Sequence, residues 1–200
     1  MTEWYMYAIA AAAAYILGCF NGALMVSLWF LRDDIRKHGS GNAGLTNTFR
    51  VFGPRWAAFV LLWDAAKGVA AVLLAGWLIG SHGALIAGVL VIIGHIFPMF
   101  FRFKGGKGIM TACGVLFSFH PIVAAIALGC FILAVLTTRY VSLGSIIAVV
   151  TLAPLMWLFS MDIWYIATSG VIAAVIIFMH RANVGRLLSG TERRFSFKRT

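Results

Sequence analysis

The feature that most constrains this chain is a series of apolar segments, each long enough to cross a lipid bilayer. A transmembrane helix needs about 20 apolar residues, and such segments follow one another from Trp4 to Met179 with short polar stretches between them. Of all residues, 62% are hydrophobic and 11% are charged, whereas a soluble domain is about 45–50% apolar. Too few polar residues remain to cover a water-soluble surface. The sequence therefore predicts an all-α integral membrane protein, with residues 1–200 forming a single polytopic membrane domain.

The placement of basic residues decides how many times the chain is predicted to cross the membrane. Residues 109–138 are too long for one span, and Pro121 disfavours helix at His120. Splitting this segment gives about seven transmembrane helices, at 4–31, 56–80, 83–101, 109–119, 121–138, 143–160 and 163–179. Every Lys and Arg except Lys67 then lies on one side. Because basic residues favour the cytoplasmic side, the N-terminus is predicted outside and the C-terminus in the cytoplasm.

The first and fourth apolar segments differ from ordinary spans. Residues 109–119 are short for a full crossing. A count of five spans with re-entrant segments keeps the same sidedness and stays open as an alternative. The first segment is preceded by Glu3 and by no Lys or Arg, so it lacks the basic start of a signal peptide. We interpret it as a retained span.

The formal net charge is +10, with 16 Lys and Arg against 6 Asp and Glu. In a soluble protein this excess would favour nucleic-acid binding, but no RNA- or DNA-binding signature occurs, so no nucleic-acid partner is predicted. Between apolar spans, the excess favours anionic ligands and membrane lipid headgroups. The three cysteines show no C-x-x-C spacing, so neither a metal site nor a disulfide framework is expected. Nothing indicates a cofactor or an obligate protein partner.

Two charged residues lie inside the second apolar segment. Asp64 and Lys67 are three residues apart and therefore share one helix face. Each would cost about 2.5–3.5 kcal/mol at the centre of a membrane, so such residues usually face a partner or a watery cavity. Two interpretations fit: a mutually neutralising packing pair, and structural support for a site at the cytoplasmic side.

The polar stretch 32–55 contains residues suited to binding an anion. Glycines let backbone N–H groups approach a phosphate closely, Ser, Asn and Thr add neutral donors, and Arg offers a fork that matches phosphate oxygens. The candidate ligands are Ser40, Gly41, Asn42, Thr46, Asn47 and Arg50. Taken alone, a loop of this composition is more often only a turn.

A second candidate loop, 102–108, opens directly into the apolar segment that begins at Ile109. Lysines, glycines and a helix N-terminus together attract an anion by charge and by backbone dipole. The residues concerned are Lys104, Gly105, Gly106, Lys107 and Gly108. The loop is not a Walker A motif, which would need Gly at Phe101 and Ser or Thr at Gly108, so ATP binding lacks support. The alternative is a cytoplasmic turn with orienting lysines.

A third polar cluster follows the last apolar segment. His180 and Asn183 are three residues apart and would share a helix face, and Arg186 and Glu192 come soon after. In isolation this cluster would be interpreted as an anchor for lipid headgroups. Three such loops on one predicted face indicate a phosphate-lined polar site at the cytoplasmic interface.

Common catalytic patterns are absent from the sequence. There is no G-x-S-x-G elbow, and no histidine has an acidic residue five positions later, as the His-x4-Asp motif of many lipid acyltransferases requires. Acidic residues are too scarce for a carboxylate dyad or a Mg²⁺-bound nucleotide site, so no metal is predicted. The remaining cations, glycines and hydroxyls suit the positioning and electrostatic stabilisation of an already activated phosphate ester or anhydride.

At these loops the sequence resembles PlsY, the acyl-phosphate:glycerol-3-phosphate acyltransferase family of bacterial membranes. The similar stretches, in family order, are SGNAGLTNTFRVFG (40–53), DAAKG (64–68), GHIFPMFFRFKGGKG (94–108), TRYVSLGS (138–145) and HRANVGRLLSGTE (180–192). The resemblance implies an enzyme of the bacterial cytoplasmic (inner) membrane whose active site faces the cytoplasm. Such an enzyme transfers a fatty acyl group from acyl phosphate to the 1-hydroxyl of glycerol-3-phosphate. The products, lysophosphatidic acid and inorganic phosphate, mark the first step of phospholipid biosynthesis.

The resemblance also implies roles for individual residues. The family's essential serine and arginine fall on Ser40 and Arg50, and its phosphate loop falls on residues 104–108. Its functional histidine and asparagine fall on His180 and Asn183. At Leu45 the chain departs from many members, which have a small or polar residue there.

Two more residues match the family less directly. Glu192 falls on a structurally important glutamate of the third motif. Ser142 lies in a further family-like stretch and is a candidate substrate ligand.

The mechanistic hypothesis assigns the phosphate charges of the two substrates to Lys104, Lys107 and the glycine N–H groups. Ser40, with neighbouring N–H groups, orients the acyl phosphate or its developing oxyanion. Arg50, His180 and Asn183 then hold glycerol-3-phosphate. The proton acceptor stays open between His180 and a donor phosphate oxygen. An acyl-enzyme on Ser40 is disfavoured, because no partner base is evident. The main rival function is secondary transport of a phosphorylated solute, and a structural subunit that binds anionic lipid is a weaker one.

Overall fold

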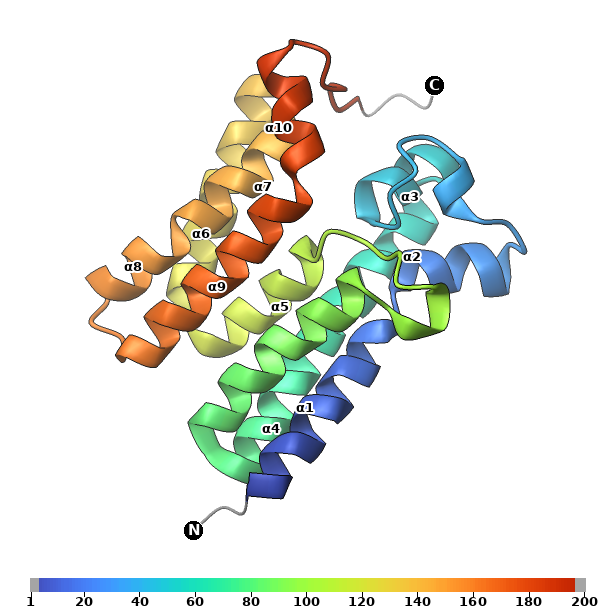
Figure 1. The fold of residues 1–200 in the computed structure, drawn as a ribbon. Helices are drawn as coiled ribbons and strands as arrows, with labels where there is room; N and C mark the ends of the chain where they lie inside the picture. The colour runs from blue at the N-terminus through green and yellow to red at the C-terminus, as the bar shows by residue number, and fades with distance from the viewer. Residues whose placement is uncertain (1–3, 197–200) are drawn as a thin grey trace. The chain divides into compact units, whose positions relative to one another are not determined.

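A computed structural model describes residues 4–196, which form helices joined by turns and loops without a β-strand (Figure 1). The chain divides into two compact units, Met1–Ser118 and Phe119–Thr200. We describe each unit by itself. Glu3 and the tail residues Lys198 and Arg199, which entered the topology prediction, lie outside the described residues.

The first apolar segment is broken near its middle. Helix α1 (Trp4–Cys19) is followed by α2 (Gly22–Leu24) and the π-helix η1 (Met25–Phe30), and the two parts meet at 40°. Asn21 adopts an extended conformation, and its Oδ1 accepts a hydrogen bond from the Leu24 N–H at 3.0 Å. Asn21 thereby starts a new helix. The expectation of one continuous helix over 4–31 is therefore wrong.

The second and third apolar segments form a helical hairpin within α4 (Pro54–Ile96). Ile79 and Gly80 are not helical, and Gly80 has a φ of 78°. Lys67 Nζ lies 3.0 Å from His95 Nδ1, although the two residues are 28 positions apart. In a straight helix they would be about 42 Å apart. The chain must therefore reverse direction at Ile79–Gly80, close to the predicted break between 80 and 83.

Close helix packing in the first unit depends on glycine. A Cβ atom on Gly18 of α1 would collide with the Val91 carbonyl oxygen of α4, and one on Gly94 would collide with the Tyr15 carbonyl oxygen. Small residues of this kind let membrane helices approach backbone to backbone. In Figure 1, α1 accordingly lies alongside α4.

Three short elements complete the first unit. They are the 3₁₀ helix η2 (Ile35–Lys37), helix α3 (Leu45–Phe52) and the 3₁₀ turn η3 (Met99–Phe101). Helix α5 (Ile109–Phe119) follows and has 11 residues, or about 16 Å, roughly half of a 30 Å hydrocarbon core. His120 has non-helical φ and ψ, and α6 begins at Pro121. The predicted break at His120–Pro121 is present.

The second unit is a helical bundle. It contains α6 (Pro121–Thr138), α7 (Val141–Val150), α8 (Leu152–Leu158), α9 (Ile163–Met179) and α10 (Arg181–Leu188). α6 packs against α7, and α8 packs against α9. Its most buried side chains include Leu152, Met156, Ile172 and Ile176.

Within residues 4–196, three helical stretches are long and apolar enough to cross a membrane, and up to five are if each bent pair counts as one span. The second bent pair is α9 with α10, which meet at 60°. Large apolar side chains such as Trp77 and Leu136, 82% and 70% exposed, point outward, as expected of surfaces that face lipid. The total of seven spans and the sidedness of the termini stay predictions.

Candidate functional site

The Ser40 loop, which is the part of the polar stretch 32–55 that precedes helix α3, is shaped by the side chain of Asn47. Asn47 Oδ1 accepts a hydrogen bond from the Ser40 N–H at 2.9 Å, and Nδ2 donates to the carbonyl oxygens of Ile35 and His38 at 3.3 and 3.1 Å. Asn47 is buried, whereas Ser40 is exposed between Gly39 and Gly41, whose φ values are 60° and 72°. The amide of Asn47, predicted as a ligand, therefore holds the loop and presents Ser40.

The other candidate ligands of this segment lie at or near helix α3. Thr46 and Arg50 are four residues apart, share one face of α3 and are half-buried. Asn42 is also half-buried and precedes the helix. The loop is tied to the hydrophobic core of the unit, because Ile35 and Ala43 are both fully buried there.

The glycine loop, residues 102–108, packs against the C-terminal end of α4. The Gly105 N–H donates to the Ile96 carbonyl oxygen at 3.0 Å, and the Gly106 N–H donates to the His95 carbonyl oxygen at 3.2 Å. A Cβ atom on Gly106 would collide with His95 Nε2. The two N–H groups expected to bind an anion are thus engaged with the helix end. Gly105 and Gly106 contribute close packing, which a side chain would prevent.

The two lysines of this loop sit immediately before α5. Lys104 is exposed and Lys107 is half-buried. Gly108 has a φ of 86°, and its carbonyl oxygen accepts the Ala112 N–H at 2.8 Å in the first turn of α5. The positive end of the α5 dipole therefore adds to the lysine charges.

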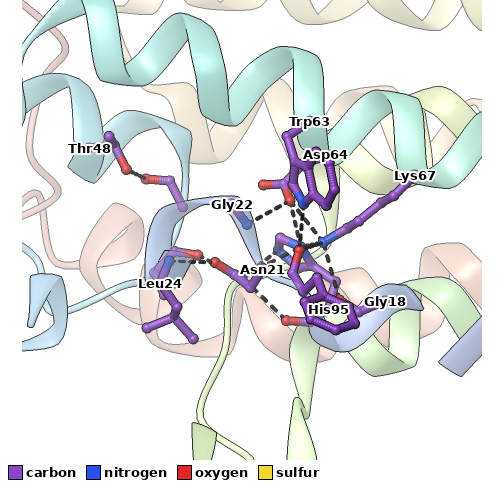
Figure 2. Close-up of polar contacts among 12 residues, drawn as sticks. Gly18, Asn21, Gly22, Leu24, Thr48, Trp63, Asp64, Lys67 and His95 are labelled. Atoms are coloured by element: carbon purple, nitrogen blue, oxygen red, sulfur yellow. Dashed lines mark hydrogen bonds and ion pairs between the residues drawn. The ribbon is translucent and has the colours of Figure 1, made fainter. Parts of the chain in front are cut away.

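A buried polar cluster lies at the break in the first apolar segment (Figure 2). Lys67 Nζ lies 2.8 Å from Asp64 Oδ1, and both side chains are 1% exposed. The same ammonium group donates to the carbonyl oxygens of Gly18 and Phe20, at 3.2 and 3.1 Å. Those carbonyls are left without helical partners by the break after Cys19, and an unpaired polar group in a membrane is costly. The predicted ion pair is present, and it stabilises the broken helix.

Asn21 extends this cluster toward the loops. Its Nδ2 donates to the Ala43 carbonyl oxygen at 3.2 Å and lies 3.3 Å from His95 Nε2. The N–H of Gly22 donates to Asp64 Oδ1 at 3.1 Å. Figure 2 shows Asn21, Asp64, Lys67 and His95 converging at the helix break. The cluster therefore connects the break in the first segment, the hairpin and both candidate loops.

In the second unit, Glu192 gathers three side chains. Its Oε1 accepts hydrogen bonds from Ser142 Oγ at 2.9 Å and from Asn183 Nδ2 at 2.7 Å, and its Oε2 accepts one from Arg186 Nε at 2.7 Å. Partial burial opposes ionisation of Glu192, but these hydrogen bonds outweigh it and hold the pKa of the carboxyl group below its usual value. Glu192 thus fixes Ser142 and Asn183.

His180 stands at the bend between α9 and α10. Its Nδ1 donates to the Ile176 carbonyl oxygen at 2.8 Å, and the residue is 3% exposed. In a neutral imidazole, this bond leaves Nε2 as the proton acceptor. Asn183 follows one turn later and is also buried. The predicted His180–Asn183 pair shares this bend.

Comparison with known proteins identifies the family. A family model described as glycerol-3-phosphate acyltransferase matches residues 8–190. A glycerol-3-phosphate acyltransferase of Thermoanaerobacter pseudethanolicus is 44% identical over 194 residues, which cover 96% of this chain and 98% of that protein. One from Chlorobaculum parvum is 39% identical over 220 residues, covering 93% and 95%. The chain belongs to the glycerol-3-phosphate acyltransferase family.

Two solved structures of this family have the same fold. The crystal structure of PlsY, an integral membrane glycerol 3-phosphate acyltransferase, in its glycerol 3-phosphate form matches with a TM-score of 0.91 and 35% identity, covering 95% of this chain and 96% of that one. The lysophosphatidic acid form matches with a TM-score of 0.88 and 34% identity over 96% of each chain. The predictions of an integral membrane protein and of an acyltransferase enzyme are confirmed.

Sequence reasoning missed several polar residues that organise this acyltransferase. Asn21 and His95 lie inside apolar segments, where a polar side chain is itself a signal of function or of a partner. Asp34 and Arg36 gave no such signal, because charged residues are ordinary in a polar loop. The contact of Arg36 with the glycine loop, and the hold of Asp34 on Arg36, arise only in the folded chain.

Proposed function

We propose that this acyltransferase transfers a fatty acyl group from acyl phosphate to the 1-hydroxyl of sn-glycerol-3-phosphate. The products are lysophosphatidic acid and inorganic phosphate. The observation that carries the proposal is the similarity, along nearly the whole chain, to PlsY in its glycerol 3-phosphate and lysophosphatidic acid forms. The acyl-phosphate donor is what the resemblance to the PlsY family implies, and the cations and glycines of the candidate loops suit an already activated phosphate anhydride.

The reaction requires one bond to form and one to break. The 1-hydroxyl oxygen attacks the acyl carbon, the bond from that carbon to the phosphate oxygen breaks, and inorganic phosphate leaves. Lys104 and Lys107 bind the phosphate groups of both substrates and stabilise the charge that develops on the leaving phosphate, and Ser40 orients the acyl phosphate. Arg50 and Asn183 hold glycerol-3-phosphate with its hydroxyl aimed at the acyl carbon.

The hydroxyl proton goes to His180 Nε2 or to an oxygen of the donor phosphate. The Nδ1 bond to Ile176 favours His180, because it orients the ring and leaves Nε2 as the acceptor. No covalent acyl-enzyme is needed, since acyl phosphate is already activated. We treat residues 1–200 as a single catalytic domain.

We place the enzyme in the bacterial cytoplasmic membrane with seven spans, the N-terminus outside and the reaction on the cytoplasmic side. The basic residues of the polar loops support this orientation. Secondary transport of a phosphorylated solute is the rival. Against it, the embedded charges of Asp64 and Lys67 pair with each other, and Lys67 also donates to the carbonyl oxygens of a helix break.

The decisive experiment incubates purified protein in detergent with palmitoyl phosphate and glycerol-3-phosphate, without ATP, coenzyme A or added metal. Equal amounts of phosphate and lysophosphatidic acid are expected, with loss of both in Arg50→Ala. The matched control is Arg55→Ala, which removes an exposed arginine that lies over the Trp56 ring and is expected to retain activity. Product formed only from acyl-coenzyme A or acyl carrier protein would exclude acyl phosphate as the donor.

A further inference from the structure

One arginine links the Ser40 loop to the glycine loop. Arg36 Nη1 donates to the carbonyl oxygens of Phe101 and Lys104, at 2.9 and 3.2 Å. Lys104 is 68 positions away in the sequence. The guanidinium group therefore connects the segment that carries Ser40 with the loop that carries the two lysines.

The other side of the same guanidinium group is held by Asp34. Arg36 Nε lies 2.9 Å from Oδ1, and Nη2 lies 2.8 Å from Oδ2. This two-point geometry matches the planar fork of arginine to a carboxylate, and lysine cannot reproduce it. Asp34 Oδ1 also accepts the Arg36 N–H at 3.0 Å and so caps η2. The arginine is oriented before it reaches the glycine loop.

The segment from Asp34 to Ser40 is fixed at both ends. Ile35 is fully buried in the core of the unit, and its carbonyl oxygen accepts a hydrogen bond from Asn47. Asn47 in turn holds the N–H of Ser40. One short segment thus sets the position of Ser40 through Asn47 and the position of Lys104 through Arg36.

The glycine loop contains two residues in an unfavourable backbone conformation, which must be stabilised by contacts elsewhere. Arg102 and Phe103 have left-handed φ values of 59° and 57°, a conformation that costs energy for residues with a Cβ atom. Both residues are exposed, so burial of their side chains does not impose it. The two carbonyls that Arg36 binds, on Phe101 and Lys104, flank this strained pair.

We propose that Arg36, oriented by Asp34, is a positioning residue. It holds residues 104–107 of the glycine loop in a fixed position relative to Ser40. This inference rests on the proposed function, in which that loop binds substrate phosphate. Arg36 touches no reacting atom in this scheme. It acts through the backbone of Lys104, so its loss changes where the lysine charges lie and leaves their number unaltered.

The test measures kcat and KM for glycerol-3-phosphate at saturating palmitoyl phosphate in Arg36→Met, Arg36→Lys and Asp34→Asn. We expect kcat/KM to fall about tenfold or more in Arg36→Met and less in Asp34→Asn, which leaves the arginine present but less ordered. Arg36→Lys is expected to rescue little, because charge alone does not supply the fork. Lys37→Met is the control: it removes the charge of an exposed neighbour and is expected to behave as wild type.

A double-mutant cycle separates positioning from general destabilisation. If Arg36 acts through the glycine loop, Arg36→Met should lower kcat/KM much less in a Lys104→Met background than in wild type. Independent, multiplicative losses in the two variants would overturn the proposal. Wild-type kinetics in both Arg36→Met and Asp34→Asn would overturn it as well. If Arg36→Met does not fold, Asp34→Asn and its own cycle with Lys104→Met decide the question.

Failure of the proposed function gives a different result. Wild-type protein that transfers no acyl group from acyl phosphate would refute the donor, whatever Arg36 does. The positioning role is then read from calorimetric binding of glycerol-3-phosphate. A Kd raised about tenfold in Arg36→Met but not in Lys37→Met supports it, and an unchanged Kd overturns it.

Discussion

Asn47 Oδ1 accepts the backbone N–H of Ser40 at 2.9 Å, so a buried amide holds the residue that the family resemblance marks as essential. Asn47→Ala removes this bond and leaves the Ile35 and His38 carbonyl oxygens without their Asn47 donor. We expect a loss of about 1–3 kcal/mol in stability and a fall of at least tenfold in kcat. Thermal unfolding in detergent and initial-rate assays measure the two effects. Full activity in Asn47→Ala would show that the Ser40 loop keeps its shape without this residue.

The Asp64–Lys67 pair is expected to be more sensitive to single than to double substitution. Asp64→Asn leaves the buried Lys67 charge without its partner, which typically costs about 3–5 kcal/mol. Adding Lys67→Met removes that charge, so the double variant should be less destabilised than the sum of the two single variants. It will not reach wild type, because the Gly18 and Phe20 carbonyls lose a donor. The measurement is a thermal-unfolding cycle, with Trp63→Phe, which removes one N–H to Phe20, as the mild control.

The lowered pKa of Glu192 predicts that the stability of the folded protein depends on pH in the acid range. Hydrogen bonds from Asn183, Arg186 and Ser142 overcome the opposing effect of burial and lower the pKa of Glu192 in the folded protein. A lowered folded-state pKa means that the carboxylate contributes stability above its unfolded pKa, about 4.3, and that this contribution disappears as pH falls through the folded pKa. The stability difference between wild type and Glu192→Gln should therefore be largest near pH 6–7 and shrink below about pH 4.

The pH experiment has an internal comparison. The pKa values of Asp33 and Asp34 are also lowered, chiefly by hydrogen bonds from His38 and Arg36. Wild type and Glu192→Gln will therefore both lose stability in acid. Only the difference between them reports on Glu192. A difference that stays constant from pH 3 to 7 would contradict the assigned role, and Arg194→Gln, an exposed change in the same segment, controls for the loss of a charged group.

His180 is predicted to act on the chemical step. Because Nδ1 donates to the Ile176 carbonyl oxygen, Nε2 is the basic nitrogen of the neutral ring. Removal of a general base typically costs about 10²–10⁴-fold in rate. We expect His180→Ala to lower kcat by that order, with the KM for glycerol-3-phosphate changed little. A raised KM with intact kcat would assign the proton to the donor phosphate instead. Arg181→Gln, at the exposed neighbouring position, is the control.

Sequence alone determined the class of the protein and the location of two of its breaks, at residues 80–83 and at His120–Pro121. Hydropathy adds up locally along the chain, so apolar length predicts a membrane protein without knowledge of any contact. The His120–Pro121 break is also local, because proline restricts the residue before it. The break at Asn21 was missed, although Asn21-Gly22 is a turn signal, because the surrounding apolar residues made a continuous span the simpler prediction.

The tertiary structure decided which polar groups meet. Lys67 reaches His95 only because the chain reverses at Ile79–Gly80, and Arg36 reaches the Lys104 carbonyl across 68 positions. Periodicity and composition identify a residue that needs a partner, but they do not name the partner, since hydrogen bonds depend on positions in space. For the same reason, Asn47 and Gly106 were predicted from sequence as phosphate ligands. In the folded chain, their polar groups bind the backbone that shapes the site.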